Sequence, residues 1–235
     1  RSSLAKALDA AVLHCRSVMS GSLLSGYVVT ETLLSRKPAR GSLEVAAASV
    51  LVLFLGSLVY WTNAAGLARV LPASREAVFG RSEYWRPFTS ILAHADVEHF
   101  AANALVFGLL AFLLYGYYGA FVFPVLSLAN GALTTALSIT TYEPDTYLVG
   151  ASGVVYWMGG FWLSLYLLVE RRLGFGKRML RAVGFSLIVL IPTVFEPEVS
   201  YRAHAIGFGL GVAFGLAYFA ARKPTLRAAE RMELE

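Results

Sequence analysis

Residues 45–68 read VAAASVLVLFLGSLVYWTNAAGLA and contain no charged side chain. A helix needs roughly 20 consecutive apolar residues to cross the hydrocarbon layer of a bilayer. The apolar residues of this stretch form a continuous run and not the one-sided stripe of a helix that packs on a water-soluble core. The stretch therefore predicts a transmembrane helix.

Five further apolar runs follow it along the chain. They comprise residues 99–118, 121–139, 151–169, 179–195 and 203–221, of which 179–195 is the shortest and least typical. The last run is closed by Arg222, Lys223 and Pro224. With 57% hydrophobic and 15% charged residues and a mean hydropathy of +0.61, the composition also favours a membrane protein. We expect an all-α, polytopic membrane protein with six transmembrane helices.

The charge pattern predicts the domain organisation and the orientation. Three Lys/Arg clusters flank the runs, at residues 36–40, 171–181 and 222–231. Positive charge concentrates in cytoplasmic segments, and six spans place all three clusters on one side. We expect a cytoplasmic or interfacial segment at residues 1–42, a six-span domain at 43–222 and a cytoplasmic tail at 223–235. Both termini would then face the cytoplasm, with the protein in the inner or plasma membrane of the cell.

Several other classes of protein are disfavoured by the sequence. The net charge of +5 comes from residues at the ends of apolar runs, so no nucleic-acid partner is expected. Cys15 is the only cysteine, which excludes an intrachain disulfide, and we interpret it as a small hydrophobic residue. The four histidines show no metal-ligand spacing, and we expect neither a metal nor another cofactor.

Polar side chains inside a span are costly and each is a candidate functional group. His99 and Asn103 are four positions apart, so a helix places them on the same face, and His94 lies just before them. Such residues also hold neighbouring helices together by hydrogen bonds, and for these three alone that structural role is the simpler interpretation.

Ser152 lies in Gly150-Ala151-Ser152-Gly153 at the start of the fourth run. Small neighbours leave its oxygen accessible, while the first turn of a helix offers unpaired N–H groups and the positive end of a dipole. This environment suits a nucleophile whose product is an oxyanion. Tyr156 follows on the same face, where its ring is available to a partner imidazole. For the tetrapeptide alone, helix packing remains an equally good interpretation.

His204 opens the sixth run and is followed by Gly207, Gly211 and Gly215. Small residues at this spacing permit close helix contact in a membrane. We expect the sixth helix to pack tightly on another helix and to bring His204 to it. In a six-span arrangement Ser152 and His204 both lie at the outer ends of their helices, in the same layer as His99 and Asn103.

Together these residues resemble the rhomboid family of intramembrane serine proteases, over roughly residues 45 to 221. The matching pieces, in the order of the family, are Trp85-Arg86, His94 with His99 and Asn103, Gly150-Ala151-Ser152-Gly153 with Tyr156, and Ala203-His204 with Gly207 and Gly211. One feature departs from the family: the acidic residue that many bacterial members carry near the end of the second span is absent from Leu113-Leu114-Tyr115-Gly116.

The resemblance implies a Ser-His dyad that cleaves single-span transmembrane substrates within the bilayer. Ser152 would be the nucleophile and His204 the general base and acid, oriented by stacking on Tyr156 in place of a carboxylate. His99, Asn103 and the Ser152 N–H would hold the oxyanion, while His94 shapes the pocket. The loop with Trp85 and Arg86 would be partly embedded, and the short fifth span would admit substrate sideways.

Two alternatives stay open. A catalytically inactive relative would bind transmembrane clients and direct them to folding or degradation. A small transporter would use the Ser, His and Asn side chains to coordinate a solute, although the sequence contains no internal repeat of the kind common in transporters.

Overall fold

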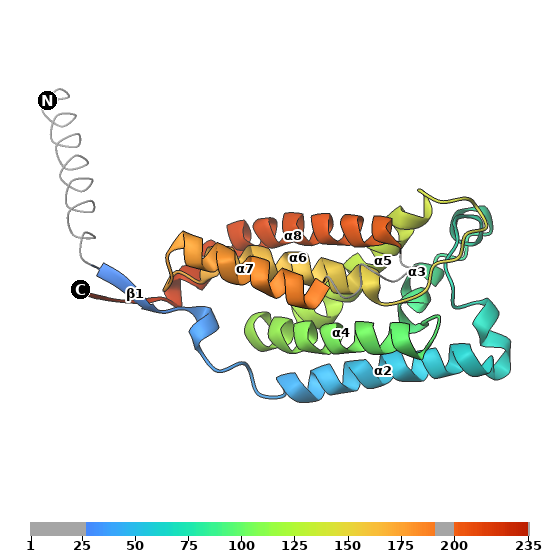
Figure 1. Ribbon diagram of the computed structural model, residues 1–235, viewed down its shortest axis with the longest axis horizontal. Coiled ribbons are helices and arrows are strands. Elements are labelled where there is room, and N and C mark those ends of the chain that lie inside the picture. The colour runs from blue at the N-terminus through green and yellow to red at the C-terminus, as the bar shows by residue number, and fades with distance from the viewer. Residues whose placement is uncertain (1–26, 191–199, 235) are drawn as a thin grey trace, which may run out of the picture.

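Five helical segments in the computed structural model, which describes residues 27–190 and 200–234, are long and apolar enough to cross a membrane. They are α2 (Ser42–Thr62), α4 (Val97–Tyr118), the segment Phe121–Ile139 that comprises η5 (Phe121–Leu126) and α5 (Ser127–Ile139), α6 (Ser152–Val169) and α8 (Tyr201–Ala228). The helices lie side by side in a bundle (Figure 1). The prediction of a helical, polytopic membrane protein is confirmed.

The predicted number of six spans is not confirmed by the described residues, because the fifth predicted run is not among the five candidate spans. The fifth predicted run, 179–195, corresponds to α7 (Phe175–Leu190), which has 16 residues. The remainder of that run lies in residues 191–199, outside the described part of the chain. α7 begins earlier than expected, and between residues 175 and 187 only Ala182 is buried.

The centre of the bundle is α6. Every residue from 152 to 165 is buried, including Trp157, Met158 and Phe161. By contrast, α2 buries only Ser42, Ala46, Leu53 and Ser57. Exposed apolar side chains cover the rest of α2, which requires lipid and not water around it. α6 is therefore the helix against which the others pack.

Two predicted helix ends differ from the structure. The first helix ends at Thr62 and not at Ala68, because Asn63 adopts a left-handed conformation with φ 49° and caps it. The last helix does not end at Ala221: it continues through Pro224 to Ala228. Pro224 removes one backbone donor, but the final turns are held by buried Leu226, which offsets that loss.

The connection between α2 and α4 is built from short helical turns. They are η2 (Ala64–Arg69), η3 (Glu76–Gly80), α3 (Arg86–Thr89) and η4 (Ser90–Leu92). Buried Arg86 holds this loop together: its guanidinium donates to the carbonyls of Arg69 at 3.0 Å and Pro72 at 2.8 Å and pairs with Glu83. A bridge between Ala73 and Leu148 attaches the loop to the segment before α6.

A two-stranded antiparallel sheet is a feature that the all-helical expectation did not include. β1 (Tyr27–Glu31) pairs with β2 (Arg231–Leu234), so segments far apart in the sequence meet beyond the end of α8 (Figure 1). η1 (Leu33–Ser35) follows β1 and leads toward α2. Of the expected segment 1–42, the residues from Tyr27 onward are described by the structure and form β1 and η1, and the first 26 residues lie outside the described part.

The glycine stripe of α8 lies against the backbone of α6. A Cβ at Gly207 would come within 2.5 Å of the Gly153 carbonyl oxygen, and one at Gly211 would overlap the Trp157 carbonyl oxygen. In return, a Cβ at Gly160 of α6 would overlap the Phe208 carbonyl oxygen. The two helices therefore pack backbone to backbone, as the spacing of small residues predicted.

This contact predicts that Gly211→Ala destabilises the bundle. Its methyl group meets fixed backbone atoms, so the helices must separate, at a cost of about 1–3 kcal/mol. Gly209→Ala is the matched control, because nothing lies within 4 Å of a Cβ there. Thermal unfolding in mild detergent should show a lower midpoint for Gly211→Ala alone. Equal midpoints for the two variants would contradict the backbone contact.

Candidate active site

Ser152 is the first residue of α6, and its position is set by the turn that precedes the helix. Gly150 has φ 114°, a conformation that a side chain would strain, and its N–H donates to the Ser90 carbonyl at 2.9 Å. A Cβ at Gly150 would also lie 3.0 Å from the His99 ring. The positive φ and the nearby His99 ring both require glycine at position 150. The contact between Gly150 and His99 brings the His99 ring close to Ser152.

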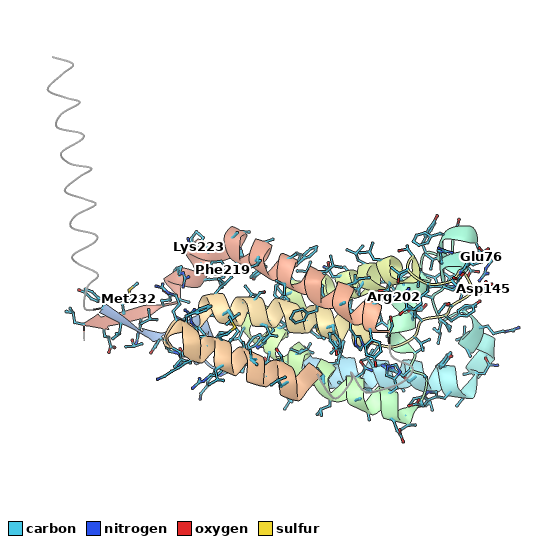
Figure 2. The ribbon with its side chains drawn as sticks, turned by 45° about the horizontal axis from the view of Figure 1, so that its top comes forward. Glu76, Asp145, Arg202, Phe219, Lys223 and Met232 are labelled. Atoms are coloured by element: carbon cyan, nitrogen blue, oxygen red, sulfur yellow. The ribbon has the colours of Figure 1, made fainter. Side chains whose placement is uncertain are left out.

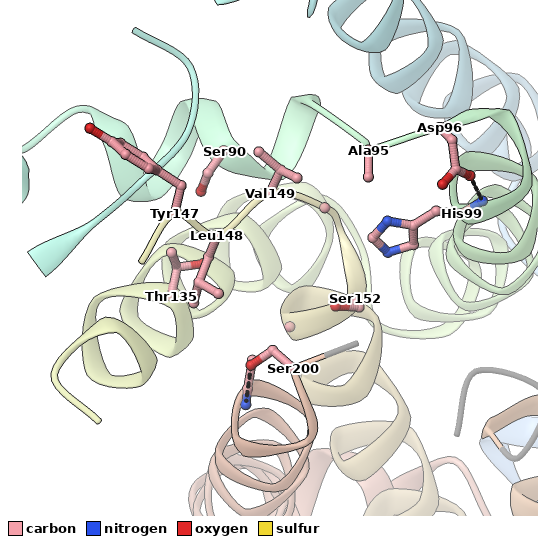
Figure 3. Close-up of a pocket in the computed structure, with 13 residues that line it drawn as sticks. Ser90, Ala95, Asp96, His99, Thr135, Tyr147, Leu148, Val149, Ser152 and Ser200 are labelled. Atoms are coloured by element: carbon pink, nitrogen blue, oxygen red, sulfur yellow. Dashed lines mark hydrogen bonds between the residues drawn. The ribbon is translucent and has the colours of Figure 1, made fainter. Parts of the chain in front are cut away.

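A cavity of about 370 Å³ opens in front of Ser152. Figure 3 shows Ser152 between the His99 ring and Ser200, with Asp96 and Tyr147 farther out. The predicted residues that line this cavity are Ser152, His99, Gly150, Gly153 and Ala203. The cavity therefore brings the Ser152 hydroxyl together with other polar side chains at one end of the bundle.

Asn103 is buried one turn from His99 on α4. Its Nδ2 donates to the His99 carbonyl at 2.9 Å, while its Oδ1 has no partner among the described residues. The carboxylate of Asp96 caps the same helix by accepting from the His99 N–H at 2.7 Å. An amide nitrogen carries two hydrogens, so Asn103 retains one donor beyond its bond to His99.

His94 connects three parts of the chain. Its Nε2 accepts from the Ala151 N–H at 3.2 Å, which makes Nδ1 the protonated nitrogen of the neutral ring. Nδ1 is 2.9 Å from the Ser57 hydroxyl on α2. The indole of Trp61 donates to the His94 carbonyl at 2.8 Å. His94 thus attaches α2 to the peptide immediately before Ser152.

His204 lies near the start of α8, in the first turn that Ser200 caps. Its ring stacks on Tyr156, with centroids 3.9 Å apart and planes 13° from parallel. Neither ring nitrogen has a hydrogen-bond partner among the described residues. The stack fixes the plane of the imidazole and leaves its nitrogens available.

The roles predicted for Ser152 with His204 and for Trp85 with Arg86 stay predictions, because no contact in the structure tests them. No hydrogen bond joins Ser152 to His204 in the described part of the chain, since both His204 nitrogens are unpaired there. Bonds of this kind are often long before substrate is bound. Trp85 and Arg86 lie in the loop and line no part of the cavity: Trp85 is exposed, and Arg86 holds the loop.

Three residues at this end were missed from the sequence. Ser57 and Trp61 are four apart on α2, and their side chains bond to His94. The sequence feature that could have indicated Ser57 and Trp61 is their spacing, which places two polar side-chain atoms on one face of the first apolar run. Asp96 was marked by its place directly before a helix, where a carboxylate commonly caps the first turn.

The arrangement supports acyl-transfer chemistry. The first-turn N–H groups of α6 have no partners within the helix, while the preceding Ala151 N–H is bound by His94. His99 lines the same cavity as Ser152, whereas Asn103 lies one turn further along α4 and does not line it. The buried His204 imidazole lies on the neighbouring helix α8 and does not itself line the cavity.

The chain matches one protein family and several known proteins. The family model of the Rhomboid domain matches residues 81–221. The chain is similar to Rhomboid-related protein 2 of Mus musculus, 30% identical over 158 residues that cover 62% of this chain and 52% of the relative. It is also similar to Rhomboid protease GluP of Bacillus subtilis, 29% identical over 51% of this chain and 22% of the relative. Putative rhomboid protease YdcA of the same bacterium is 26% identical over 62% of this chain and 71% of the relative. The matched region thus spans about half of the mouse relative and less of GluP.

The burial of His94 predicts a pH-dependent stability. His94 precedes the first residue of α4, and burial, with a smaller contribution from His99, lowers its pKa to about 3. The unfolded chain takes up this proton near pH 6.5 and the folded chain does not, so stability falls as the pH drops below 6.5. The slope is about 1.4 kcal/mol per pH unit.

The measurement compares thermal unfolding of the wild type and His94→Gln at pH 7.5, 6.5 and 5.5. The variant cannot titrate at this position, so the wild type should lose stability more steeply over the acidic step. Parallel curves for the two proteins would show that His94 is not held neutral by the fold.

Proposed function

Because this chain belongs to the rhomboid family, we propose that it is an intramembrane serine endopeptidase in which Ser152 is the nucleophile and His204 the general base and acid. The observation that carries the proposal is the His204 ring, stacked on Tyr156 with both nitrogens unpaired among the described residues. It lies on α8, whose neighbouring residue Ala203 lines the same cavity as Ser152.

The reaction proceeds in two steps. Ser152 Oγ attacks the scissile carbonyl carbon as His204 accepts the hydroxyl proton. His204 then gives this proton to the leaving amine, and an acyl-enzyme ester remains on Ser152. Water attacks the ester with His204 again as base, and the returning proton regenerates the serine hydroxyl. Stacking on Tyr156 orients the imidazole, which in many serine hydrolases is the task of a carboxylate.

The oxyanion of each tetrahedral intermediate is stabilised by donors already in place. The Ser152 N–H lies in the first turn of α6, and His99 lines the same cavity. The free Nδ2 hydrogen of Asn103 is the third donor. Donors that a folded helix already holds in position need little reorganisation when charge develops, which makes them effective in a water-poor site.

The substrate class is a transmembrane segment, in our proposal one of single-span proteins. The cavity gives water a route to Ser152, because Asp96, Ser200 and the Tyr147 side chain lie along it. Sideways entry past α7 is favoured by its loose packing, since Ala182 is the only buried residue between positions 175 and 187.

The proposed orientation follows the basic residues. The cavity with Ser152 lies at one end of the bundle, and the Lys/Arg clusters lie toward the other, where Figure 2 labels Lys223. With the basic end in the cytoplasm, cleavage occurs near the outer surface of the inner or plasma membrane.

A second candidate function is client binding without cleavage. It is favoured by one observation, the absence of a Ser152–His204 hydrogen bond within the described residues. An inactive relative would hold a transmembrane segment in the same cavity. Cleavage assays separate the two functions directly.

Cleavage should depend on both Ser152 and His204. Purified protein is incubated with a single-span substrate that carries helix-breaking residues near its outer end. Ser152→Ala and His204→Ala should each lower the rate by about 1000-fold or more, because each removes one half of the proton-transfer pair. A fluorophosphonate probe should label wild-type Ser152 and not Ser152→Ala.

Ser164→Ala is the control for this experiment. Ser164 is buried on the same helix, its hydroxyl donates to the Phe161 carbonyl at 2.9 Å, and it does not line the cavity. Its rate should stay near that of the wild type. Cleavage that persists in Ser152→Ala would falsify the nucleophile assignment, and a wild type that binds substrate without cleaving it would favour the second function.

Asn103→Ala should lower kcat by about 10- to 1000-fold with a smaller change in KM, the order expected for one oxyanion donor. Asn130→Ala is the matched control: Asn130 is equally buried on α5 and makes the same bond to the carbonyl four residues back, at 2.9 Å. An equal loss in both variants would indicate a packing effect and would remove Asn103 from the oxyanion site.

A further inference from the structure

A second cavity, of about 360 Å³, lies at the end of the bundle away from Ser152. It is formed where the end of α4 meets the last turns of α8 and the segment after η1. Arg222 is 18 positions beyond His204 on the same helix, which corresponds to about 27 Å along its axis. The cavity is therefore separate from the candidate active site and plays no part in the proposed cleavage.

The lining of this cavity is cationic. Arg36 and Arg222 both line it, and none of its lining residues is acidic. The nearest carboxylate in sequence, Glu230, is already paired with Arg171 at 3.1 Å and with Arg227. Two guanidinium groups without a carboxylate between them favour an anionic ligand.

Hydroxyl groups accompany the two arginines. The Tyr118 hydroxyl is buried and has no hydrogen-bond partner among the described residues, which is costly for a polar atom. Tyr218, four positions before Arg222 on α8, also lines the cavity and carries a further hydroxyl group. Arg36 uses one nitrogen to donate to the Ala229 carbonyl at 2.8 Å, so its other N–H groups remain. These donors converge on one space.

The depth of the cavity in the membrane indicates which kind of anion it is suited to bind. Tyr117 and Tyr118, at the end of α4, form a cluster of rings 5.8–6.2 Å apart with Tyr218 of α8 and the buried Trp162 of α6. Tyrosine and tryptophan concentrate at the headgroup layer of a bilayer. A basic pocket between helices at that level matches the headgroups of anionic phospholipids.

We propose that this cavity binds a phosphate group, through Arg36, Arg222 and the Tyr118 hydroxyl. Guanidinium forks and a phenol O–H are suitable donors for phosphate oxygens. The headgroup of an anionic phospholipid supplies that phosphate at the required depth, and free phosphate is the other source of the same chemistry. A ligand held here joins α4 to α8 at the end opposite His204.

The test uses the full-length protein in zwitterionic detergent-lipid micelles. Native mass spectrometry measures the retention of phosphatidylglycerol against phosphatidylcholine, and inorganic phosphate is added alone in a parallel arm. Arg36→Gln/Arg222→Gln should weaken phosphatidylglycerol binding by about 10-fold or more, since it removes two charged donors. Tyr118→Phe should weaken it less, because it removes one neutral donor.

The control is Lys177→Gln/Lys223→Gln, which loses the same charge at two exposed residues that do not line the cavity. Its phosphatidylglycerol binding should stay within about 2-fold of the wild type. Arginine-dependent binding of inorganic phosphate, without any preference for phosphatidylglycerol, would support the site and assign free phosphate as its source. Equal loss in the two double variants, or no loss in either, would overturn the proposal.

Thermal unfolding of each variant without added lipid is measured alongside. A folded double variant that no longer gains stability from phosphatidylglycerol supports the proposal. If the arginine variant does not fold, Tyr118→Phe carries the test, and unchanged phosphatidylglycerol binding by Tyr118→Phe then overturns it.

Discussion

The contact between α6 and α8 is the interaction on which the rest of the bundle depends. Gly207 and Gly211 lie against carbonyl groups of α6, so the two backbones touch over successive turns. Lipid offers no hydrophobic force to join helices, and close van der Waals contact supplies much of the attraction in its place. Because Ser152 opens one helix and His204 lies in the first turn of the other, the same contact sets the distance between the two groups.

Much of the fold was predictable because lipid imposes a length and a composition on each crossing helix. The runs at 99–118, 121–139 and 151–169 match observed helices within two residues at each end. Ends that depend on local geometry were not predictable in this way. Thr62 is followed by a left-handed Asn63, and α8 continues past Pro224 because its last turns contact protein. The strands β1 and β2 are short, and each is defined only by its distant partner.

In the candidate site, too, some features could be predicted from the sequence and others could not. The small residues around Ser152 and the glycines that follow His204 at helical spacing could be recognised in the sequence. The structure brings Ser152 and His99 to one cavity. The hydrogen bonds of His94 could not be predicted from the sequence, because its partners Ser57 and Ala151 lie 37 and 57 positions away. Sequence spacing reports neighbours within a helix, whereas these contacts arise only when three segments assemble.

The pairing of β1 with β2 has a consequence for the order of folding. Thr30 and Arg231 meet across 201 positions of chain, so every helix between them must be synthesised before the strands can touch. Closing so long a loop is entropically costly until the intervening bundle has already brought its ends together. The sheet is therefore among the last elements to form, and hydrogen exchange at the amides of β1 distinguishes a completed bundle from one that still lacks its final helix.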